Sequence, residues 1–292
     1  MISAALSANI RVRAVFRLIR SGLHLLWGSM TVATVFPFIG IGLQRKLKQR
    51  WSRQLADILG VKVVGDIDTL PAGLLVANHI SFLDIFVINA VAPTAFVSKA
   101  DVGGWPVIGW LCRHTETLFM ERGSRVAAQK ARHAIVTELR RGNRVAIFPE
   151  GTSTPGDRVL PFHGALFQSA VDAGQHVTPV ALRYTDSAGR PDTRPAYAGE
   201  TTLLECLWRI AQADQIQAHV HTLPSLCAVA LHRHDLAARA HRAIEAHVNP
   251  SPQERPAADT AVEIPGDLRG ERRSGSRPTD IRNPAPTASA LS

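Results

Sequence analysis

Cysteine is scarce in this chain. Its 292 residues contain three cysteines, Cys112, Cys206 and Cys227, which are widely spaced and odd in number. This pattern argues against a secreted disulfide framework and against a cysteine-based zinc site, and it favours a reducing compartment. A chain of this length can bury a core large enough to need neither disulfides nor a structural metal.

Acidic residues are absent from the first 53 residues. That segment holds nine of the 33 Lys and Arg residues, while the rest of the chain carries equal numbers of basic and acidic residues. The net charge of +9 therefore comes from the N-terminal end. A nucleic-acid-binding protein more often spreads positive charge over its folded domain. The basic end instead indicates a membrane-anchoring segment, because anionic headgroups attract each Lys or Arg by about 1 kcal/mol.

A run of 19 residues without formal charge, 25–43, lies inside this basic segment. As one helix it would reach about 28 Å, close to the hydrocarbon thickness of a bilayer. Basic clusters on both sides leave the orientation open, and Gly28, Pro37, Gly40 and Gly42 leave room for a kinked or re-entrant helix. A buried helix pair is the alternative. A cleaved signal peptide fits worse, because the cluster RKLKQR follows and no A-x-A site does.

Beyond residue 54, short apolar runs alternate with amphipathic ones. Strands are expected at 73–78, 94–99, 117–121, 144–149 and 177–184. Helices are expected at 81–91, 125–140, 162–173, 203–213 and 235–248. This alternation predicts an α/β fold with a single mostly parallel or mixed sheet and flanking helices.

The chain divides by composition into three segments. Residues 1–53 form the basic, hydrophobic membrane-anchoring segment and residues 54–248 the α/β domain. Residues 249–292 are rich in Pro, Arg, Ser and Asp and almost lack large apolar side chains. This composition predicts a disordered tail.

The first of two polar strand ends reads Asn78-His79-Ile80-Ser81-Phe82-Leu83-Asp84. Ligands of α/β sheets bind at the carboxyl ends of strands. A carboxylate five residues after a histidine, across a helix start, can hold the imidazole in one tautomer and make it a general base. The alternative reading is that Asn78 and Asp84 only cap the turn while His79 packs beside them.

The second polar strand end reads RVAIFPEGTSTPG, residues 144–156. Pro149 ends the strand, and Gly151 with Thr152 after Glu150 gives a small-residue turn whose backbone N–H groups can face an anion. The segment lacks the Gly-Lys-Ser/Thr of a nucleotide P-loop, which argues against an NTPase.

Taken together, the two ends resemble signatures of the glycerophospholipid acyltransferases, the lysophosphatidic acid acyltransferase family. The segment NHISFLD matches the family's Asn-His, four residues, Asp signature, and Phe148 to Thr152 match its Phe-Pro-Glu-Gly-Thr signature. The segment LFMER, residues 118–122, approximates a further signature between them, and VTPV, residues 177–180, a last one. The resemblance covers roughly residues 54–230.

The resemblance implies direct acyl transfer at a membrane. His79 would take the proton of an acceptor hydroxyl, Asp84 would orient His79, and the hydroxyl would attack the thioester of acyl-CoA or acyl-carrier protein. It implies a lysolipid acceptor and neither a cofactor nor a metal, while the charge pattern argues against nucleic acid. Cytosolic donors would place the catalytic domain on the cytoplasmic side, and the compact architecture favours the cell inner membrane. The substrate-binding residues that the resemblance implies are Asn78, Arg122, Glu150, Gly151, Thr152 and Pro179.

The acceptor is most directly 1-acyl-sn-glycerol-3-phosphate, which would give phosphatidic acid. Relatives acting on that lipid usually carry Arg directly after Glu-Gly-Thr, where this chain has Ser153. Serine cannot replace a bidentate phosphate partner, although Arg125 or Arg158 remain as substitutes. A lyso-ornithine lipid O-acyltransferase, whose acceptor has no phosphate, is therefore the alternative. Outside this class stand a non-catalytic lipid-binding scaffold and a hydrolase that uses Ser81.

Overall fold

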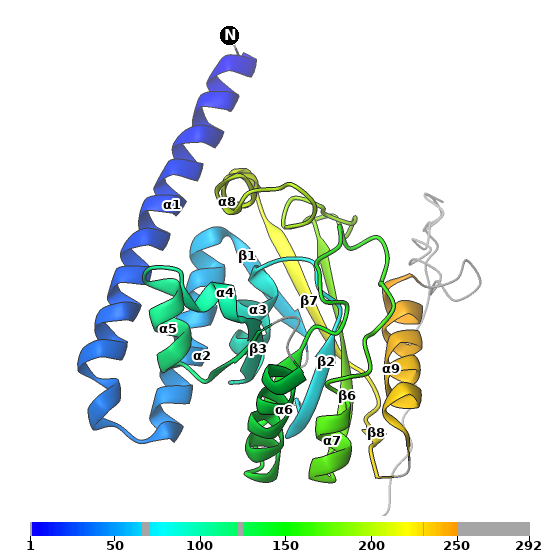
Figure 1. Cartoon of the computed structure of the whole chain (residues 1–292). Coiled ribbons are helices and arrows are strands. Elements are labelled where there is room, and N and C mark those ends of the chain that lie inside the picture. The colour runs from blue at the N-terminus through cyan, green and yellow to red at the C-terminus, as the bar shows by residue number, and fades with distance from the viewer. Residues whose placement is uncertain (1, 66–69, 122–124, 230, 250–292) are drawn as a thin grey trace, which may run out of the picture. The chain divides into compact units, whose positions relative to one another are not determined.

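The computed structural model of the protein describes residues 2–65, 70–121, 125–229 and 231–249. Strands and helices alternate along most of this chain (Figure 1). The strands are β1 (Val61–Gly65), β2 (Gly73–Ala77), β3 (Ala95–Lys99), β4 (Thr117–Met120), β5 (Arg144–Ile147), β6 (His176–Thr185), β7 (Ile216–Thr222) and β8 (Leu226–Cys227). The helices are α1 (Ile2–Thr34), the short η1 (Phe36–Phe38), α2 (Ile41–Leu59), α3 (Leu83–Val91), α4 (Ala100–Gly103), α5 (Ile108–His114), α6 (Arg125–Arg140), α7 (Gln168–Ala173), α8 (Leu203–Gln212) and α9 (Arg233–Val248).

The strands form one mixed sheet in the order β1-β7-β6-β2-β5-β3-β4, with β8 also paired to β6. Neighbouring strands run parallel except that β6 is antiparallel to β7 and β8. The predicted α/β fold with a mixed sheet and flanking helices is thus confirmed. Strand β2 lies between β5 and β6, and all five of its residues are buried. Burial on both faces explains why its sequence, GLLVA, is apolar throughout.

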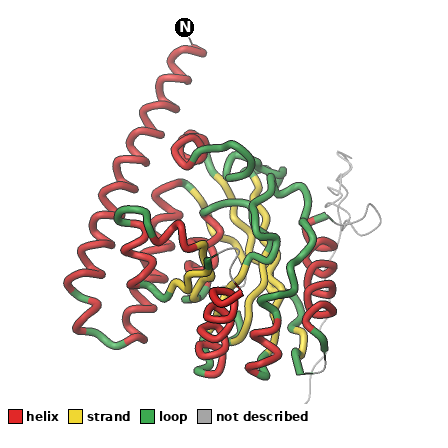
Figure 2. Tube along the Cα trace, viewed as in Figure 1, coloured by secondary structure: helices red, strands yellow, loops and turns green. Residues whose placement is uncertain are grey.

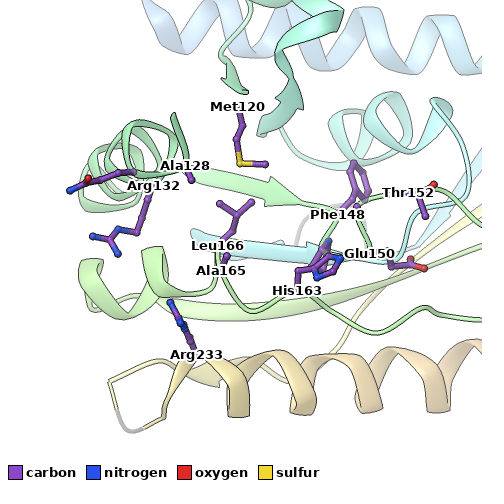
Figure 3. Close-up of a pocket in the computed structure, with 13 residues that line it drawn as sticks. Met120, Ala128, Arg132, Phe148, Glu150, Thr152, His163, Ala165, Leu166 and Arg233 are labelled. Carbon is purple, nitrogen blue, oxygen red and sulfur yellow. The ribbon is translucent and has the colours of Figure 1, made fainter. Parts of the chain in front are cut away.

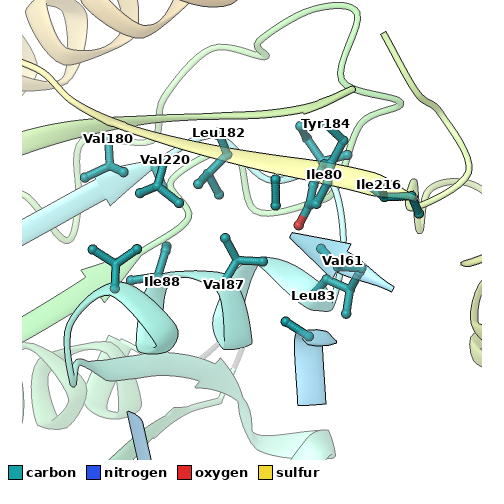
Figure 4. Packing of buried hydrophobic residues seen from close by; sticks show 14 of the residues in the cluster. Val61, Ile80, Leu83, Val87, Ile88, Val180, Leu182, Tyr184, Ile216 and Val220 are labelled. Atoms are coloured by element: carbon teal, nitrogen blue, oxygen red, sulfur yellow. The ribbon is translucent and has the colours of Figure 1, made fainter. Parts of the chain in front are cut away.

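Helices cover both faces of the sheet (Figures 1 and 2). Because successive strand residues point to opposite faces, Leu75 packs in a cluster with α2, α3 and α8, whereas Leu74 packs in a second cluster with α6, α7 and α9. Figure 4 shows the first cluster, in which Val87 and Ile88 of α3 face Leu182 of β6. The two clusters place β2 and β5 at the centre of the domain, with their carboxyl ends side by side.

One predicted helix begins later than its sequence pattern indicates. The pattern favoured a helix from residue 162, but α7 starts at Gln168. The backbone N–H of Leu160 donates to Glu150 Oε2 at 2.8 Å, and that of His163 donates to the carbonyl of Pro149 at 3.0 Å. These two bonds hold residues 160–163 in a non-helical path next to Pro149 and Glu150, so the helix begins only after them.

The apolar run of the N-terminal segment is split between two helices. Helix α1 ends at Thr34, Pro37 lies in η1, and α2 begins at Ile41, so the run is not a single helix. A Cβ atom at Gly28 of α1 would lie 2.4 Å from Nε1 of Trp51 in α2. Glycine is therefore needed where the two helices approach, and the Trp51 indole also donates to the carbonyl of His24 at 3.1 Å.

Part of the N-terminal positive charge is paired inside the protein. Arg45 and Lys48 of α2 bind the Glu116 carboxylate, with N–O distances of 2.6 and 2.8 Å. Arg17 of α1 donates to the carbonyls of Ala211 and Ala213 at the end of α8, where the helix dipole favours a cation. The helix pair is thereby joined to the α/β part by charged contacts.

Two predictions about the ends of the chain have different outcomes. Among the residues that the structure describes, no helix is both long and apolar enough to cross a bilayer, so the transmembrane helix is not confirmed. The predicted tail, apart from Asn249, lies outside the described residues. The boundaries at residues 53 and 248 stay predictions.

Candidate active site

His79 and Asp84 meet where β2 ends. His79 follows the strand by two residues, and Asp84 lies in the first turn of α3. Imidazole Nδ1 and carboxylate Oδ2 are 2.9 Å apart, with the Asp84 side chain fully buried and the His79 side chain 22% exposed. The structure thus brings together the two residues that the sequence proposed as a pair.

The buried Asp84 carboxylate accepts three further hydrogen bonds. The backbone N–H groups of Ile80 and Ser81 donate to Oδ2 at 2.8 and 3.0 Å, and the hydroxyl of Tyr184 donates to Oδ1 at 2.7 Å. Burial and the neighbouring Asp84 charge raise the pKa of the Tyr184 phenol well above its usual value. Tyr184 therefore keeps its proton and acts as a donor to the carboxylate.

This arrangement leaves the second ring nitrogen of His79 available. Because a carboxylate accepts a hydrogen bond, it favours the tautomer with the proton on Nδ1, and Nε2 then has a lone pair. Nε2 makes no hydrogen bond with any residue that the structure describes. The Phe148 ring stacks on the imidazole with centroids 4.2 Å apart, which holds the ring plane. His79 thus has the geometry of a general base.

The segment after β5 braces the backbone of His79. Its N–H donates to Glu150 Oε1 at 2.7 Å, while its carbonyl accepts from the N–H of Thr154 at 2.8 Å. Burial raises the pKa of the Glu150 carboxyl, opposed by the N–H groups of Leu160 and His79 that bind it. Both carboxylate oxygens of Glu150 are engaged in this way, so the geometry gives Glu150 a positioning role. A direct substrate contact through Glu150 stays a prediction.

Asn78 connects the site to β6. Its amide is fully buried, donating to the carbonyl of Leu182 at 3.0 Å and accepting from the Leu182 N–H at 2.8 Å. These bonds extend the β2–β6 pairing past the end of β2. In this position Asn78 ties two strands together, and its predicted substrate contact stays a prediction.

Pro179 occupies a central strand, where a missing N–H is normally costly. Its carbonyl accepts from Leu223 at 2.9 Å, so its nitrogen faces the same side, toward β7 and β8. Strand β6 pairs with β8 at residues 176–177 and with β7 at residues 180–185, which leaves Pro179 between the two partners. The proline is tolerated because no ladder bond is required of its nitrogen there. Its predicted role in shaping the substrate site is untested.

A cavity of about 800 Å³ is lined by residues that contact His79, although His79 itself is not among its lining residues (Figure 3). Phe148, which stacks on His79, and Glu150, which binds its backbone, both line this cavity. Gly151 and Thr152 line it too and are exposed, with Gly151 at φ +71°, a conformation that favours glycine. Phe148 and Glu150 therefore separate this cavity from the His79–Asp84 pair.

The remaining residues proposed from sequence have different positions. Arg122 and the side chain of Arg125 lie outside the part of the chain that the structure describes. Arg158 is exposed and does not line the cavity. Ser81 is fully buried, and its hydroxyl oxygen accepts from the Leu83 N–H at 3.2 Å. That burial argues against Ser81 as a hydrolytic nucleophile.

Sequence reasoning missed several residues of the site. The sequence pattern places Tyr184 in a strand and gives it no role. That strand, β6, pairs with β2 and so can supply a partner for Asp84. His163, Arg132 and Arg233 also line the cavity, and no motif marks them. Their contribution depends on how α6, the residues before α7 and the start of α9 pack together.

Comparison with known proteins assigns the chain to a family. The family model described as Acyltransferase matches residues 61–183. A lyso-ornithine lipid O-acyltransferase from Pseudomonas aeruginosa is 38% identical over 207 residues, which cover 69% of this chain and 78% of that protein. The chain belongs to the glycerophospholipid acyltransferase family. The resemblance noted in its motifs is thereby confirmed, and the prediction of an O-acyltransferase agrees with the names of these relatives.

Two further relatives define how far the likeness extends. A 1-acyl-sn-glycerol-3-phosphate acyltransferase from Neisseria meningitidis is 42% identical over 163 residues, which span 56% of this chain and 64% of that relative. The crystal structure of the 1-acyl-sn-glycerophosphate acyltransferase of Thermotoga maritima matches with a TM-score of 0.62 at 19% identity, covering 83% of this chain and 96% of that one. At this identity, the structural match supports the fold of the present chain.

Replacing Tyr184 with Phe tests the support of Asp84. The change removes one hydrogen bond to a buried carboxylate, which should lower the free energy of unfolding by about 1.5–3 kcal/mol. We also expect kcat/KM for acyl transfer to fall about tenfold, because His79 loses part of its orientation. Denaturant unfolding and steady-state kinetics measure the two effects. Tyr197→Phe is the matched control, since the Tyr197 hydroxyl makes no hydrogen bond with a described residue; equal effects of both variants would contradict the assignment.

Replacing Glu150 with Gln tests the brace of His79. An amide has one acceptor oxygen, so the N–H of either His79 or Leu160 would lose its partner, at a cost of about 1–3 kcal/mol. We expect kcat to fall about tenfold with little change in the KM of either substrate. Glu200→Gln, at an exposed position, is the control. A rise in the KM of the acceptor at unchanged kcat would instead show that Glu150 binds substrate directly.

Proposed function

We propose that this protein is an O-acyltransferase that moves a fatty acyl chain from a thioester donor to the free hydroxyl of a lysolipid. His79 Nε2 accepts the hydroxyl proton while the oxygen attacks the thioester carbonyl. When the tetrahedral intermediate collapses, the C–S bond breaks, the ester remains, and the sulfur takes the proton that His79 returns and leaves as a thiol. The observation that supports this reaction best is the His79–Asp84 pair, in which imidazole Nε2 makes no hydrogen bond with a residue that the structure describes.

The first candidate acceptor is 1-acyl-sn-glycerol-3-phosphate, with phosphatidic acid as product. The identity to the Neisseria enzyme supports it. Lyso-ornithine lipid is the second candidate, and a specific observation favours it. Ser153 stands where an Arg is usual in phosphate-binding relatives, and its hydroxyl donates to the Tyr197 carbonyl. A serine engaged in this way offers no charge to a phosphate.

A membrane surface is the proposed partner, with the active site on the cytoplasmic side of the cell inner membrane. Helix α1 exposes a row of large apolar side chains at helical spacing, namely Val12, Val15, Phe16, Ile19, Leu23, Leu26, Trp27 and Met30. Phe38, in the turn between α1 and α2, is 86% exposed. Such a row typically enters the interface of a bilayer, and exposed Arg11, Arg20 and Lys46 lie on the same helix pair for anionic headgroups.

Substitution of His79 by Ala tests the proposed reaction. With labelled acyl-CoA or acyl-carrier protein, the wild type should acylate lysophosphatidate or lyso-ornithine lipid, and His79→Ala should lose at least about 10²-fold in rate. Chromatographic separation of the lipid products identifies the acceptor. His133→Ala, at an exposed position on α6, serves as the matched control.

Other outcomes of this assay separate the rival functions. Acyl transfer that survives His79→Ala would overturn the catalytic assignment. Lysolipid binding without transfer by the wild type would favour the non-catalytic scaffold. Release of free fatty acid without an acceptor would favour a hydrolase.

Charged substitutions on α1 test membrane docking. Phe16→Glu combined with Leu23→Glu places two charges in the apolar row, each of which should oppose insertion into a lipid interface. We expect the wild type to float with vesicles that contain anionic lipid and the double variant to remain unbound at equal helix content by circular dichroism. Val126→Glu changes an apolar side chain of α6 that is 63% exposed and should leave flotation unchanged. Flotation of the double variant like the wild type would exclude this face.

A further inference from the structure

The cavity lined by Phe148 and Glu150 extends to two guanidinium groups. Arg132 of α6 and Arg233, the first residue of α9, line the end opposite Glu150 and Thr152 (Figure 3). Apolar side chains of β4 and the residues before α7 line the part between. The cavity thus combines an end lined by Phe148 and Glu150, which contact His79, with an apolar middle and a cationic end.

Arg233 lacks a partner within the described part of the chain. Its Nε atom is buried without a hydrogen bond, and its guanidinium forms no ion pair there. Arg132 forms one ion pair, from Nε to Asp172 Oδ2 at 3.3 Å, and its side chain is 41% exposed. Buried donors are rarely left without acceptors. The two guanidinium groups therefore offer hydrogen-bond donors to an anion at this end of the cavity.

The place of Arg132 restricts which anion this is. Arg132 lies seven residues into α6, so it is about 10 Å along the helix from its start, which follows the carboxyl end of β4. In lysophosphatidate the phosphate is on the carbon next to the one that bears the reacting hydroxyl. That phosphate must stay close to His79 during transfer. A long donor arm, by contrast, separates its thioester from its phosphate.

We propose that Arg132 and Arg233 bind the phosphate of the 4′-phosphopantetheine arm of the acyl donor. The arm lies along the cavity and presents its thioester beside Phe148 and His79. Acyl-CoA and acyl-carrier protein carry this same arm, so either donor fits the subsite. The inference rests on the proposed acyl transfer and adds the donor's position to it.

Steady-state kinetics of Arg233→Gln with matched donors test the subsite. The donors are acyl-CoA, acyl-carrier protein, acyl-4′-phosphopantetheine and acyl-pantetheine, the last of which has no phosphate. We expect KM to rise about tenfold for the three phosphate-bearing donors at similar kcat, with no change for acyl-pantetheine or the lysolipid. Arg132→Gln should act in the same direction. Arg239→Gln on α9 and Lys130→Gln on α6, both exposed, are the controls.

Equilibrium binding separates this proposal from the proposed reaction. Wild-type full-length protein in detergent micelles should bind unacylated CoA, and Arg233→Gln should bind it about tenfold more weakly, at an unchanged thermal midpoint of unfolding. CoA binding that depends on Arg233 without any acyl transfer would support the subsite and reject the reaction. Equal CoA binding by wild type and variant, or none by wild type, would overturn the subsite.

The kinetic pattern can also overturn the proposal in favour of another occupant. A KM change confined to the lysolipid would assign the two arginines to the acceptor. A change in acyl-chain preference alone would place the acyl chain in the cavity. An effect on acyl-CoA alone would assign the arginines to the nucleotide phosphates of CoA rather than to the arm.

Discussion

The buried carboxylate of Asp84 is the constraint on which the catalytic geometry depends. A buried charge destabilises the folded state unless hydrogen-bond donors surround it. Removing one partner of a buried ion pair typically costs about 3–5 kcal/mol of stability. Asp84 meets this requirement with donors from the end of β2, the start of α3 and Tyr184 of β6. The imidazole of His79 is one of the donors, so its orientation follows from the same requirement. Stability and catalytic geometry therefore share one set of bonds.

The order of strands in the sheet makes this set of bonds possible. Strand β2 lies between β6 and β5, so its carboxyl end receives side chains from both neighbours. Tyr184 and Leu182 come from β6, whereas Glu150 and Thr154 come from the segment after β5. Two motifs about 70 residues apart in the sequence thus meet at the backbone of one histidine. Glu150 supports His79 by accepting a hydrogen bond from the backbone N–H of His79, not by contacting the imidazole.

The N-terminal helices show a division of labour among their charges. Arg13 and Arg17 bind the end of α8, and Arg45 and Lys48 bind Glu116. These groups anchor the helix pair to the α/β part. The positive charge on the outer surface of the pair is therefore smaller than a count of its Lys and Arg residues indicates. Burial lowers the pKa of Lys48, and its contact with Glu116 opposes that shift. The apolar row of α1 remains exposed and makes the outer surface of the helix pair hydrophobic.

The motifs of the chain resemble those of its family. The sequence by itself also predicted the fold class and offered the pairing of His79 with Asp84 as one of two readings. Each follows from short-range information: apolar periodicity sets strands and helices, and a spacing of five residues across a helix start brings the two side chains together. Only the tertiary structure decided that Tyr184 completes the Asp84 site, that Asn78 and Glu150 act as braces, and that Arg132 and Arg233 share a cavity with Phe148. Those contacts join residues far apart in the chain. They depend on strand order and on helix packing across the sheet, which local sequence patterns do not encode.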